Sequence, residues 1–215
     1  MTYQHRTLLF DTGGDGPALL GNMRALGIDP AGVEDVVLSH IHKDHTGGLG
    51  ALLAVGARPV VYLLPSFPAD FKRQVGRTAR VVEVTPGQAL SEGIFTTGEM
   101  GDRIREQALV IRTDCGLVVM TGCAHPGIVQ IIARAQELFD APVYLVVGGF
   151  HLRNKSKSEI ATIIEGFRQM GVRKVAPCHC TGDRAIAMFA SEYGDDFISA
   201  GVGRIITVEP SGVER

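Results

Sequence analysis

Three histidines and one aspartate lie within six residues, from His40 to His45, in the order H-x-H-x-D-H. Neutral imidazole and carboxylate are good ligands for zinc, iron and manganese. His40 and His42 face the same side of an extended segment, because side chains alternate along it. Asp44 and His45 follow across a bend, for which the next two glycines supply conformational freedom. The pattern therefore predicts that one ion binds the first pair and a second ion binds the Asp44–His45 pair.

Three more histidines, His125, His151 and His179, each follow an apolar run that is typical of a buried strand. Open sheets gather ligands at the ends of their strands. A lone histidine is more often a structural residue, but three in this context, beside the H-x-H-x-D-H segment, favour metal binding. We therefore expect His125 and His179 to be ligands. His151 is either a ligand, a residue that orients a ligand, or a group that faces the substrate.

Strands and helices alternate along the chain. The turn Asp114-Cys115-Gly116 predicts a hairpin, Ser156 is a plausible helix cap, and residues 65–78 are ambiguous. A β-rich middle between β-α units indicates an α/β fold of two packed sheets with helices outside. We expect helices over 18–26, 49–55, 126–139, 156–170 and 184–191, and strands over 7–10, 36–38, 59–63, 80–84, 94–97, 108–113, 117–120, 143–147, 175–176 and 205–208.

The composition sets further limits. A chain of 215 residues with 45% hydrophobic content can bury a sizeable core, so we expect a single domain over residues 1–215. The formal net charge of −2 argues against a nucleic-acid partner. No apolar signal region or membrane-spanning run is present. The four cysteines do not read as a disulfide framework, so we expect a reduced, cytoplasmic protein without a membrane partner.

The motifs resemble those of the metallo-β-lactamase superfamily over nearly the whole chain. Phe10-Asp11-Thr12-Gly13 is similar to the first motif of that family, whose aspartate organises the metal loops, and Leu38-Ser39-His40 is similar to the lead-in of its metal signature. Residues 121–128, 148–152 and 177–182 resemble the branch related to the dihydropterin–ribofuranosylaminobenzene phosphate synthase of methanopterin biosynthesis. The resemblance implies a four-layer αββα sandwich with a metal site at one edge of the sheets. It also implies one or two divalent ions, zinc in preference to manganese or iron.

Two features depart from the pattern of this family at the metal site. Many members have a Thr-Gly-Asp whose aspartate bridges two metals, whereas this chain has Thr121-Gly122-Cys123. Either a Cys123 thiolate bridges the two metals, or His125 serves as the ligand in its place, and we favour His125. The usual upstream histidine is not evident, and Glu106 or Gln107 occupies its region, so one metal is expected to be held more weakly.

A third departure is the short segment before Asp11, where relatives place one or two more strands, so the fold is expected to be N-terminally shortened. The strand over 7–10 would then leave a sheet edge that must be paired, capped or blunted. Symmetric pairing is the commonest remedy, so we expect a homo-oligomer. The competing outcome is a monomer whose edge is blunted by residues 3–6.

The chemistry follows from the expected metals. A bound divalent ion supplies hydroxide near neutral pH and polarises a carbonyl or phosphoryl oxygen. Asp44 would also orient the attacking water, and His151 would donate a proton or hydrogen bond to the departing oxygen. The chain is therefore expected to be a metal-dependent hydrolase. Its expected metal ligands are His40, His42, Asp44, His45, His125 and His179.

The substrate class is the least determined feature. Arg153, Lys155, Lys157 and Arg184 favour an anionic substrate if they face the metals, although a solvated polar loop is the simpler interpretation. The expected substrate is a small, anionic phosphoester, ester, thioester or lactone. The alternatives are a synthase that forms a carbon–nitrogen bond between a pterin and a phosphoribosyl compound, and a non-catalytic metal-binding or sensing module.

Overall fold

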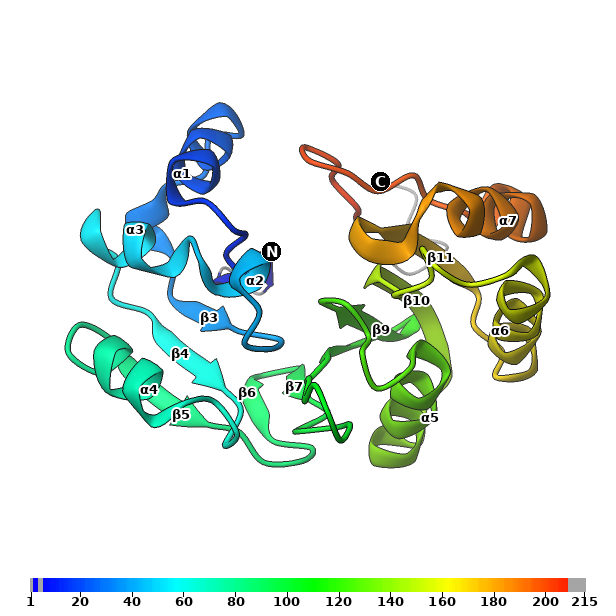
Figure 1. The fold of residues 1–215 in the computed structure, drawn as a ribbon, viewed down its shortest axis with the longest axis horizontal. Helices are drawn as coiled ribbons and strands as arrows, with labels where there is room; N and C mark the ends of the chain where they lie inside the picture. Colours follow the sequence, from blue (N-terminus) through cyan, green and yellow to red (C-terminus); the bar gives the residue numbers. More distant parts are fainter. Residues whose placement is uncertain (1, 4–5, 209–215) are drawn as a thin grey trace.

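Two β-sheets face each other between two groups of helices in the computed structural model, which describes residues 2–3 and 6–208 (Figure 1). In the first sheet β2 to β5 run parallel, and β1 pairs antiparallel with β2 at the edge. Its strands, in spatial order, are β1 (Thr2–Tyr3), β2 (Arg6–Phe10), β3 (Asp35–Val37), β4 (Val60–Leu63) and β5 (Arg80–Glu83).

The second sheet is mixed. β9, β10 and β11 run parallel, whereas β6, β7, β8 and β9 pair antiparallel with their neighbours. The predicted hairpin joins β8 to β9. In spatial order the strands are β11 (Lys174–Cys178), β10 (Val143–Gly149), β9 (Gly116–Thr121), β8 (Leu109–Thr113), β7 (Ile94–Thr96) and β6 (Ala89–Ser91).

Helices cover the outer faces of both sheets, which confirms the four-layer αββα arrangement (Figure 1). α1, α3 and α4 lie outside the first sheet, and α5, α6 and α7 lie outside the second. The helices are α1 (Gly16–Ala25), α2 (Lys43–Thr46), α3 (Leu49–Ala54), α4 (Ala69–Val75), α5 (Ile128–Phe139), α6 (Lys157–Gln169) and α7 (Asp183–Tyr193), with short 3-10 turns η1 (Pro30–Gly32), η2 (His179–Thr181) and η3 (Gly194–Asp196).

The core fills both the space between the sheets and the space under the helices. Leu109 and Ile111 of β8 pack in the cluster that contains Val37 of β3, whereas Val110 packs with Ile131 of α5. Alternate side chains of one strand therefore bury both of its faces. The cluster shared by the two sheets supports our proposal that residues 1–215 form one domain.

Two expectations about the elements need correction, and three short elements were not predicted. Residues 205–208 form no strand: Ile206 packs against the core, but Ile205 is 82% exposed, so the apolar pattern reflects packing without strand pairing. The helix expected from Pro126 begins at Ile128, because Gly127 occupies the N-cap with φ 102°. β1, β6 and α2 were not predicted, since such short elements carry no periodic pattern.

The edge beside residues 7–10 is occupied by β1, with Thr2 paired with Thr7 and Tyr3 with Arg6. Gln4 and His5, which were expected to blunt this edge, lie outside the described residues. Among the residues that the structure describes, no helix combines the length and the apolar content needed to cross a membrane.

Candidate metal centre

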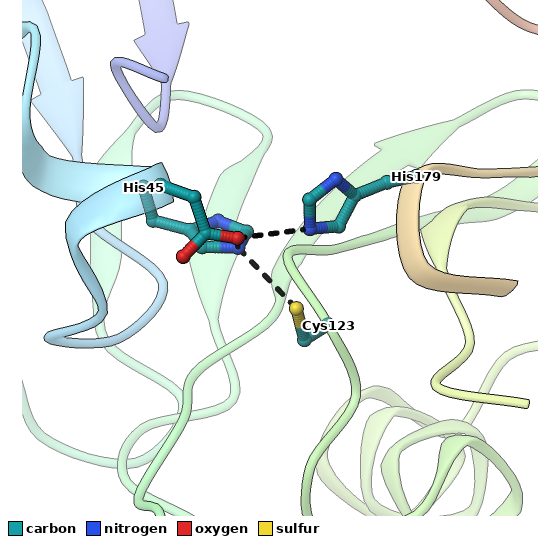
Figure 2. A group of neighbouring side chains, drawn as sticks. His45, Cys123 and His179 are labelled. Atoms are coloured by element: carbon teal, nitrogen blue, oxygen red, sulfur yellow. Dashed lines mark hydrogen bonds and ion pairs between the residues drawn. The ribbon is translucent and has the colours of Figure 1, made fainter. Parts of the chain in front are cut away.

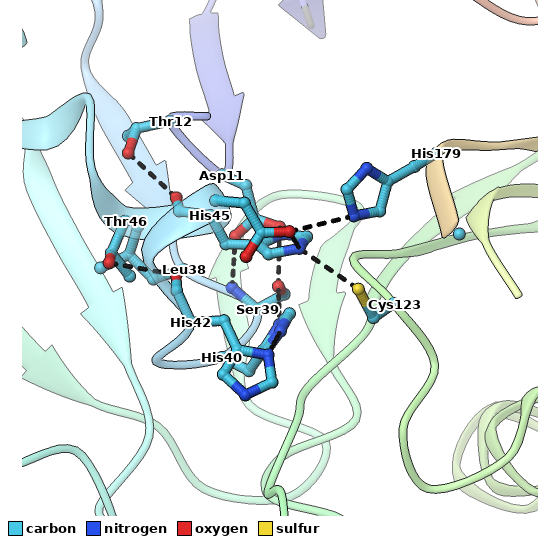
Figure 3. Close-up of polar contacts among 12 residues, drawn as sticks. Asp11, Thr12, Leu38, Ser39, His40, His42, His45, Thr46, Cys123 and His179 are labelled. Atoms are coloured by element: carbon cyan, nitrogen blue, oxygen red, sulfur yellow. Dashed lines mark hydrogen bonds and ion pairs between the residues drawn. The ribbon is translucent and has the colours of Figure 1, made fainter. Parts of the chain in front are cut away.

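Side chains able to bind a metal gather where strands of both sheets end (Figure 3). β2 and β3 are parallel, as are β9, β10 and β11, so their carboxyl ends share one edge of each sheet. His125 follows β9, His151 follows β10, and His179 begins η2 directly after β11. The loop after β3 carries the first two histidines of the H-x-H-x-D-H segment, and His45 lies on α2.

Asp11, which directly follows β2, forms hydrogen bonds with the loop after β3 and with His45 on α2. Its Oδ1 accepts a hydrogen bond from Ser39 N at 2.7 Å. Its Oδ2 accepts from Ser39 Oγ at 2.6 Å and from His45 Nδ1 at 2.6 Å. Asp11 itself has a left-handed backbone, φ 58°, which turns its carboxylate toward these donors. These are the contacts expected of an aspartate that organises the metal loops.

The same network fixes which ring nitrogens carry lone pairs. Ser39 Oγ has one proton and gives it to Asp11, so it accepts from His40 Nδ1, 2.9 Å away. The unprotonated Nε2 of His40 then faces His42 Nδ1 at 3.0 Å. His45 likewise donates from Nδ1 to Asp11, which leaves its Nε2 as the lone-pair nitrogen. A carboxylate behind a histidine in this way orients it for metal binding.

Asp44 and His45 lie on the short helix α2, whereas the sequence indicated a flexible bend. Gly47 and Gly48 both have ordinary negative φ values, so they are not needed for conformational freedom. A Cβ at Gly48 would collide with the carbonyl oxygen of Thr12, and one at Gly47 would meet that of Gly14. The expectation for these glycines is therefore wrong, and their role is close packing of α2 against the loop after β2.

His40, His42 and His125 form the first group of metal donors, with one nitrogen from each within 4.8 Å of the others. Burial, together with the charges of neighbouring histidines, lowers the pKa of His40 to about 2 and that of His125 to about 4. The His40 and His125 rings are therefore held in the neutral form, which is the form that binds metal. Nε2 of His125 is buried and has no hydrogen-bond partner among the described residues. A bound cation would satisfy that nitrogen.

Asp44, His45, Cys123 and His179 form the second group (Figure 2). Asp44 Oδ2 lies 3.4 Å from both His45 Nε2 and His179 Nε2, and Cys123 Sγ lies 3.3 Å from His45 Nε2. Ligands of a tetrahedral zinc ion, with bonds of about 2.1 Å, are spaced about 3.4 Å apart. The second group therefore has the donor spacing of a tetrahedral zinc site, and the three nitrogens of the first group lie within 4.8 Å of one another.

The electrostatics of the second group differ from those of the first. Burial opposes a charge on His45, but its hydrogen bond to Asp11 and the charge of Asp11 outweigh this and raise the pKa of His45. A hydrogen bond with Cys180, together with burial, raises the pKa of the Cys123 thiol. A metal ion that binds Cys123 must therefore displace a proton.

Sequence reasoning left Cys123 outside the preferred ligand set, whereas the structure brings both Cys123 and His125 to the centre. The available signal was the Thr-Gly-Cys string itself, which occupies the place of a metal-bridging aspartate. His151 is also present: its ring centroid lies 4.5 Å from that of His125, and its backbone is left-handed with φ 55°. With Cys123 and His125 it forms a third, overlapping donor group.

A pocket of about 600 Å³ opens over the two donor groups. Its lining also includes Arg153 and Lys155, from the segment after His151. Arg153 makes no ion pair with any described residue, whereas Lys155 Nζ pairs with Glu159 at 2.9 Å. Lys157 and Arg184 do not line the pocket. Two of the four basic residues singled out in the sequence thus face the candidate centre.

Comparisons with known proteins agree with this architecture. A family model described as the metallo-beta-lactamase superfamily matches residues 2–129. A Methanocaldococcus jannaschii protein named 7,8-dihydropterin-6-methyl-4-(beta-D-ribofuranosyl)-aminobenzene-5'-phosphate synthase is 30% identical over 247 aligned residues, which cover 94% of this chain and 84% of that protein.

Two solved structures extend the comparison. A metal-dependent hydrolase of the beta-lactamase superfamily superposes with a TM-score of 0.83 and 32% sequence identity, covering 95% of this chain and 90% of the other. The short form of human tRNase Z superposes with a TM-score of 0.62 over 98% of this chain and 91% of its own. Its identity is only 12%, so that likeness concerns the fold alone.

Proposed function

This chain belongs to the metallo-beta-lactamase superfamily, and from that premise we propose that it is a metal-dependent hydrolase of small, anionic ester, phosphoester, thioester or lactone substrates. The observation that carries this proposal is the placement of two metal-donor groups at the floor of one pocket. In such a site a divalent metal, zinc by preference, supplies hydroxide near neutral pH and Lewis-acid polarisation of the reacting carbonyl or phosphoryl group.

Each side chain of the candidate metal centre has a separate proposed role. We propose that His40, His42 and His125 hold one ion, and that Asp44, His45 and His179 hold the other together with Cys123. Asp44 Oδ2, which faces both His45 and His179, is also placed to accept a hydrogen bond from the attacking water. His151 lies on the pocket wall beside His125, so it is the candidate proton donor to the departing oxygen.

An anionic substrate is supported by the basic side chains that line the pocket together with the donor groups. The Arg153 guanidinium has no carboxylate partner among the described residues. It is therefore available for bidentate hydrogen bonding to a phosphate or carboxylate of the substrate. A pocket of about 600 Å³ is within the usual range of about 300–1,000 Å³ for small-molecule sites.

The four cysteines, all of them described, form no disulfide, which supports the proposed reducing, cytoplasmic location.

A second candidate function rests on the 30% identity to the protein named as a dihydropterin–ribofuranosylaminobenzene phosphate synthase. To separate the two, the zinc- or manganese-loaded protein is assayed against a panel of carboxylic esters, thioesters, lactones and phosphoesters. Turnover that disappears with a chelator and returns with metal supports the hydrolase. Joining of a dihydropterin, activated by a leaving group on its 6-methyl carbon, to a ribofuranosylaminobenzene phosphate, without hydrolysis of the panel, supports the synthase. Stoichiometric metal binding without either reaction indicates a metal-binding module.

The roles of Cys123 and His125 can be tested separately. His125→Ala is expected to remove one metal ion per chain, because it takes one of only three donors from the first group. Cys123→Ser is expected to retain that ion, to hold the other more weakly, and to lose the near-ultraviolet sulfur-to-cobalt absorption of the cobalt-substituted protein. If Cys123→Ser keeps both the stoichiometry and the cobalt spectrum of the wild type, His125 alone has replaced the bridging aspartate.

We also propose that the protein forms a homodimer, because the first sheet ends in the two-residue strand β1 and edge strands tend to pair. Light scattering behind a sizing column is expected to give a species near twice the chain mass of 23.0 kDa. A single species at the chain mass, at tens of micromolar protein, would contradict the dimer.

A further inference from the structure

The turn after β9 is where the chain delivers two donors, Cys123 and His125, and it is held in an unusual shape. Ala124 between them has a left-handed backbone with φ 62°, which a residue with a Cβ adopts only when its surroundings impose it. The N–H groups of these three consecutive residues all point to one side. Three converging N–H groups are stable only if an anionic or strongly polar acceptor binds them.

Glu106 supplies that acceptor. Its Oε1 accepts hydrogen bonds from Cys123 N at 2.8 Å and from Ala124 N at 2.9 Å. Its Oε2 accepts from His125 N at 2.8 Å. Both oxygens are thus directed at the backbone, and Glu106 belongs to none of the described metal-donor groups. The carboxylate acts on the donors through the turn that carries them.

The three hydrogen bonds from the backbone offset the cost of burying the Glu106 carboxylate. The residue is fully buried and has no ion pair with any described residue. Burial raises the pKa of its carboxyl, and the hydrogen bonds from the backbone of His125, Ala124 and Cys123 oppose that rise. A buried carboxylate is costly unless it is hydrogen-bonded. Its position is therefore fixed by the same turn that it stabilises.

The start of the turn packs closely against the loop that carries the other donors. A Cβ at Gly122 would collide with Ser39 Oγ and would come within 2.9 Å of Asp11 Oδ2. The start of the turn therefore rests directly on the Asp11–Ser39 network, and Glu106 accepts the N–H groups of the next three residues. Any relaxation of the turn moves Cys123 and His125 relative to His45 and His40.

We propose that Glu106 is a positioning residue of the metal centre: by accepting the N–H groups of residues 123–125 it imposes the strained turn that aims Cys123 and His125 at their ions. This inference rests on the proposed metal-dependent function and explains how a chain with Thr-Gly-Cys directs two donors, separated by a single residue, from one strand end. It assigns no contact between Glu106 and substrate or metal.

The test is Glu106→Gln, which keeps the size of the side chain but turns one oxygen into an NH₂ donor. Whichever way the amide lies, it faces at least one backbone N–H that it cannot accept. Loss of a residue that orients ligands weakens metal binding by about 10–100-fold. We expect that loss in zinc competition titrations against a chromophoric chelator, with a reduced sulfur-to-cobalt absorption in the cobalt-loaded protein.

Tyr62→Phe is the matched control, since it also removes a buried hydrogen bond, from Tyr62 Oη to Leu90 O at 3.1 Å. It is expected to lower stability while leaving metal affinity and the cobalt spectrum unchanged. If Glu106→Gln does not fold, Glu106→Asp is the second test. It keeps the negative charge but shortens the side chain, so that the carboxylate no longer reaches all three N–H groups, and weaker metal binding is again expected.

The outcomes separate this inference from the proposed function. Wild-type affinity and spectrum in a folded Glu106 variant overturn the positioning role and leave the metal-dependent function intact. Wild-type protein that binds no zinc, manganese or cobalt overturns both. Equal weakening in Tyr62→Phe and Glu106→Gln would show a general effect of stability and would also refute the positioning role.

Discussion

His42→Ala and His179→Ala are each expected to bind about one metal ion fewer per chain than the wild type and to lose turnover. His42 belongs to the three-histidine group and His179 to the group with Asp44, His45 and Cys123, so each substitution empties a different site. The loss of activity should exceed the roughly 10–100-fold that follows removal of a residue that only orients a ligand. A double variant should bind almost no metal.

Metal content after purification without chelators gives the measurement, read by elemental analysis beside turnover of the best substrate in the ester panel. Lys43→Ala is the matched control, because Lys43 lies between His42 and Asp44 but offers no donor atom to either group. It should keep wild-type metal content. Full occupancy and normal turnover in either histidine variant would show that the corresponding donor group has been assigned wrongly.

Asp11→Asn is expected to lower metal affinity by about 10–100-fold even though Asp11 belongs to neither donor group. The carboxylate accepts from Ser39 N, Ser39 Oγ and His45 Nδ1, and an amide can replace only one of its two oxygens. In one orientation of the asparagine amide its NH₂ group would face Ser39 N and leave that donor unpaired; in the other it would face His45 Nδ1, and the proton on His45 would no longer be held there. His45 Nε2 would then lose its fixed lone pair.

The readout for Asp11→Asn is a competition titration, with thermal unfolding in chelator to measure stability without metal. Asp15→Asn is its control: Asp15 caps α1 by accepting from Ala18 N at 2.8 Å, and asparagine caps a helix equally well. A change in metal affinity in the control, or none in Asp11→Asn, would contradict the orienting role.

Local sequence was sufficient for elements with long periodic patterns or strong caps. Ser156, expected as a cap, forms a full capping box with Glu159 at the start of α6. The H-x-H-x-D-H string identified metal chemistry because imidazole and carboxylate at such spacing have few other uses. Local sequence failed at residues 205–208, where an apolar alternation reflects packing against the core. The expectation for Gly47 and Gly48 was also wrong, because these positions need a small residue only to pack against the carbonyl oxygens of the neighbouring loop.

The sequence by itself therefore determined the kinds of donor and the strand ends that carry them, because both depend on residue type and short-range spacing. Only the tertiary structure decided which donors can share an ion and what Glu106 does. His45 and Cys123 are 78 residues apart, and their 3.3 Å contact exists because two sheets pack face to face with parallel strand ends at the same edge. The three backbone N–H groups that Glu106 accepts lie on a different segment, and no local pattern encodes a contact of that kind.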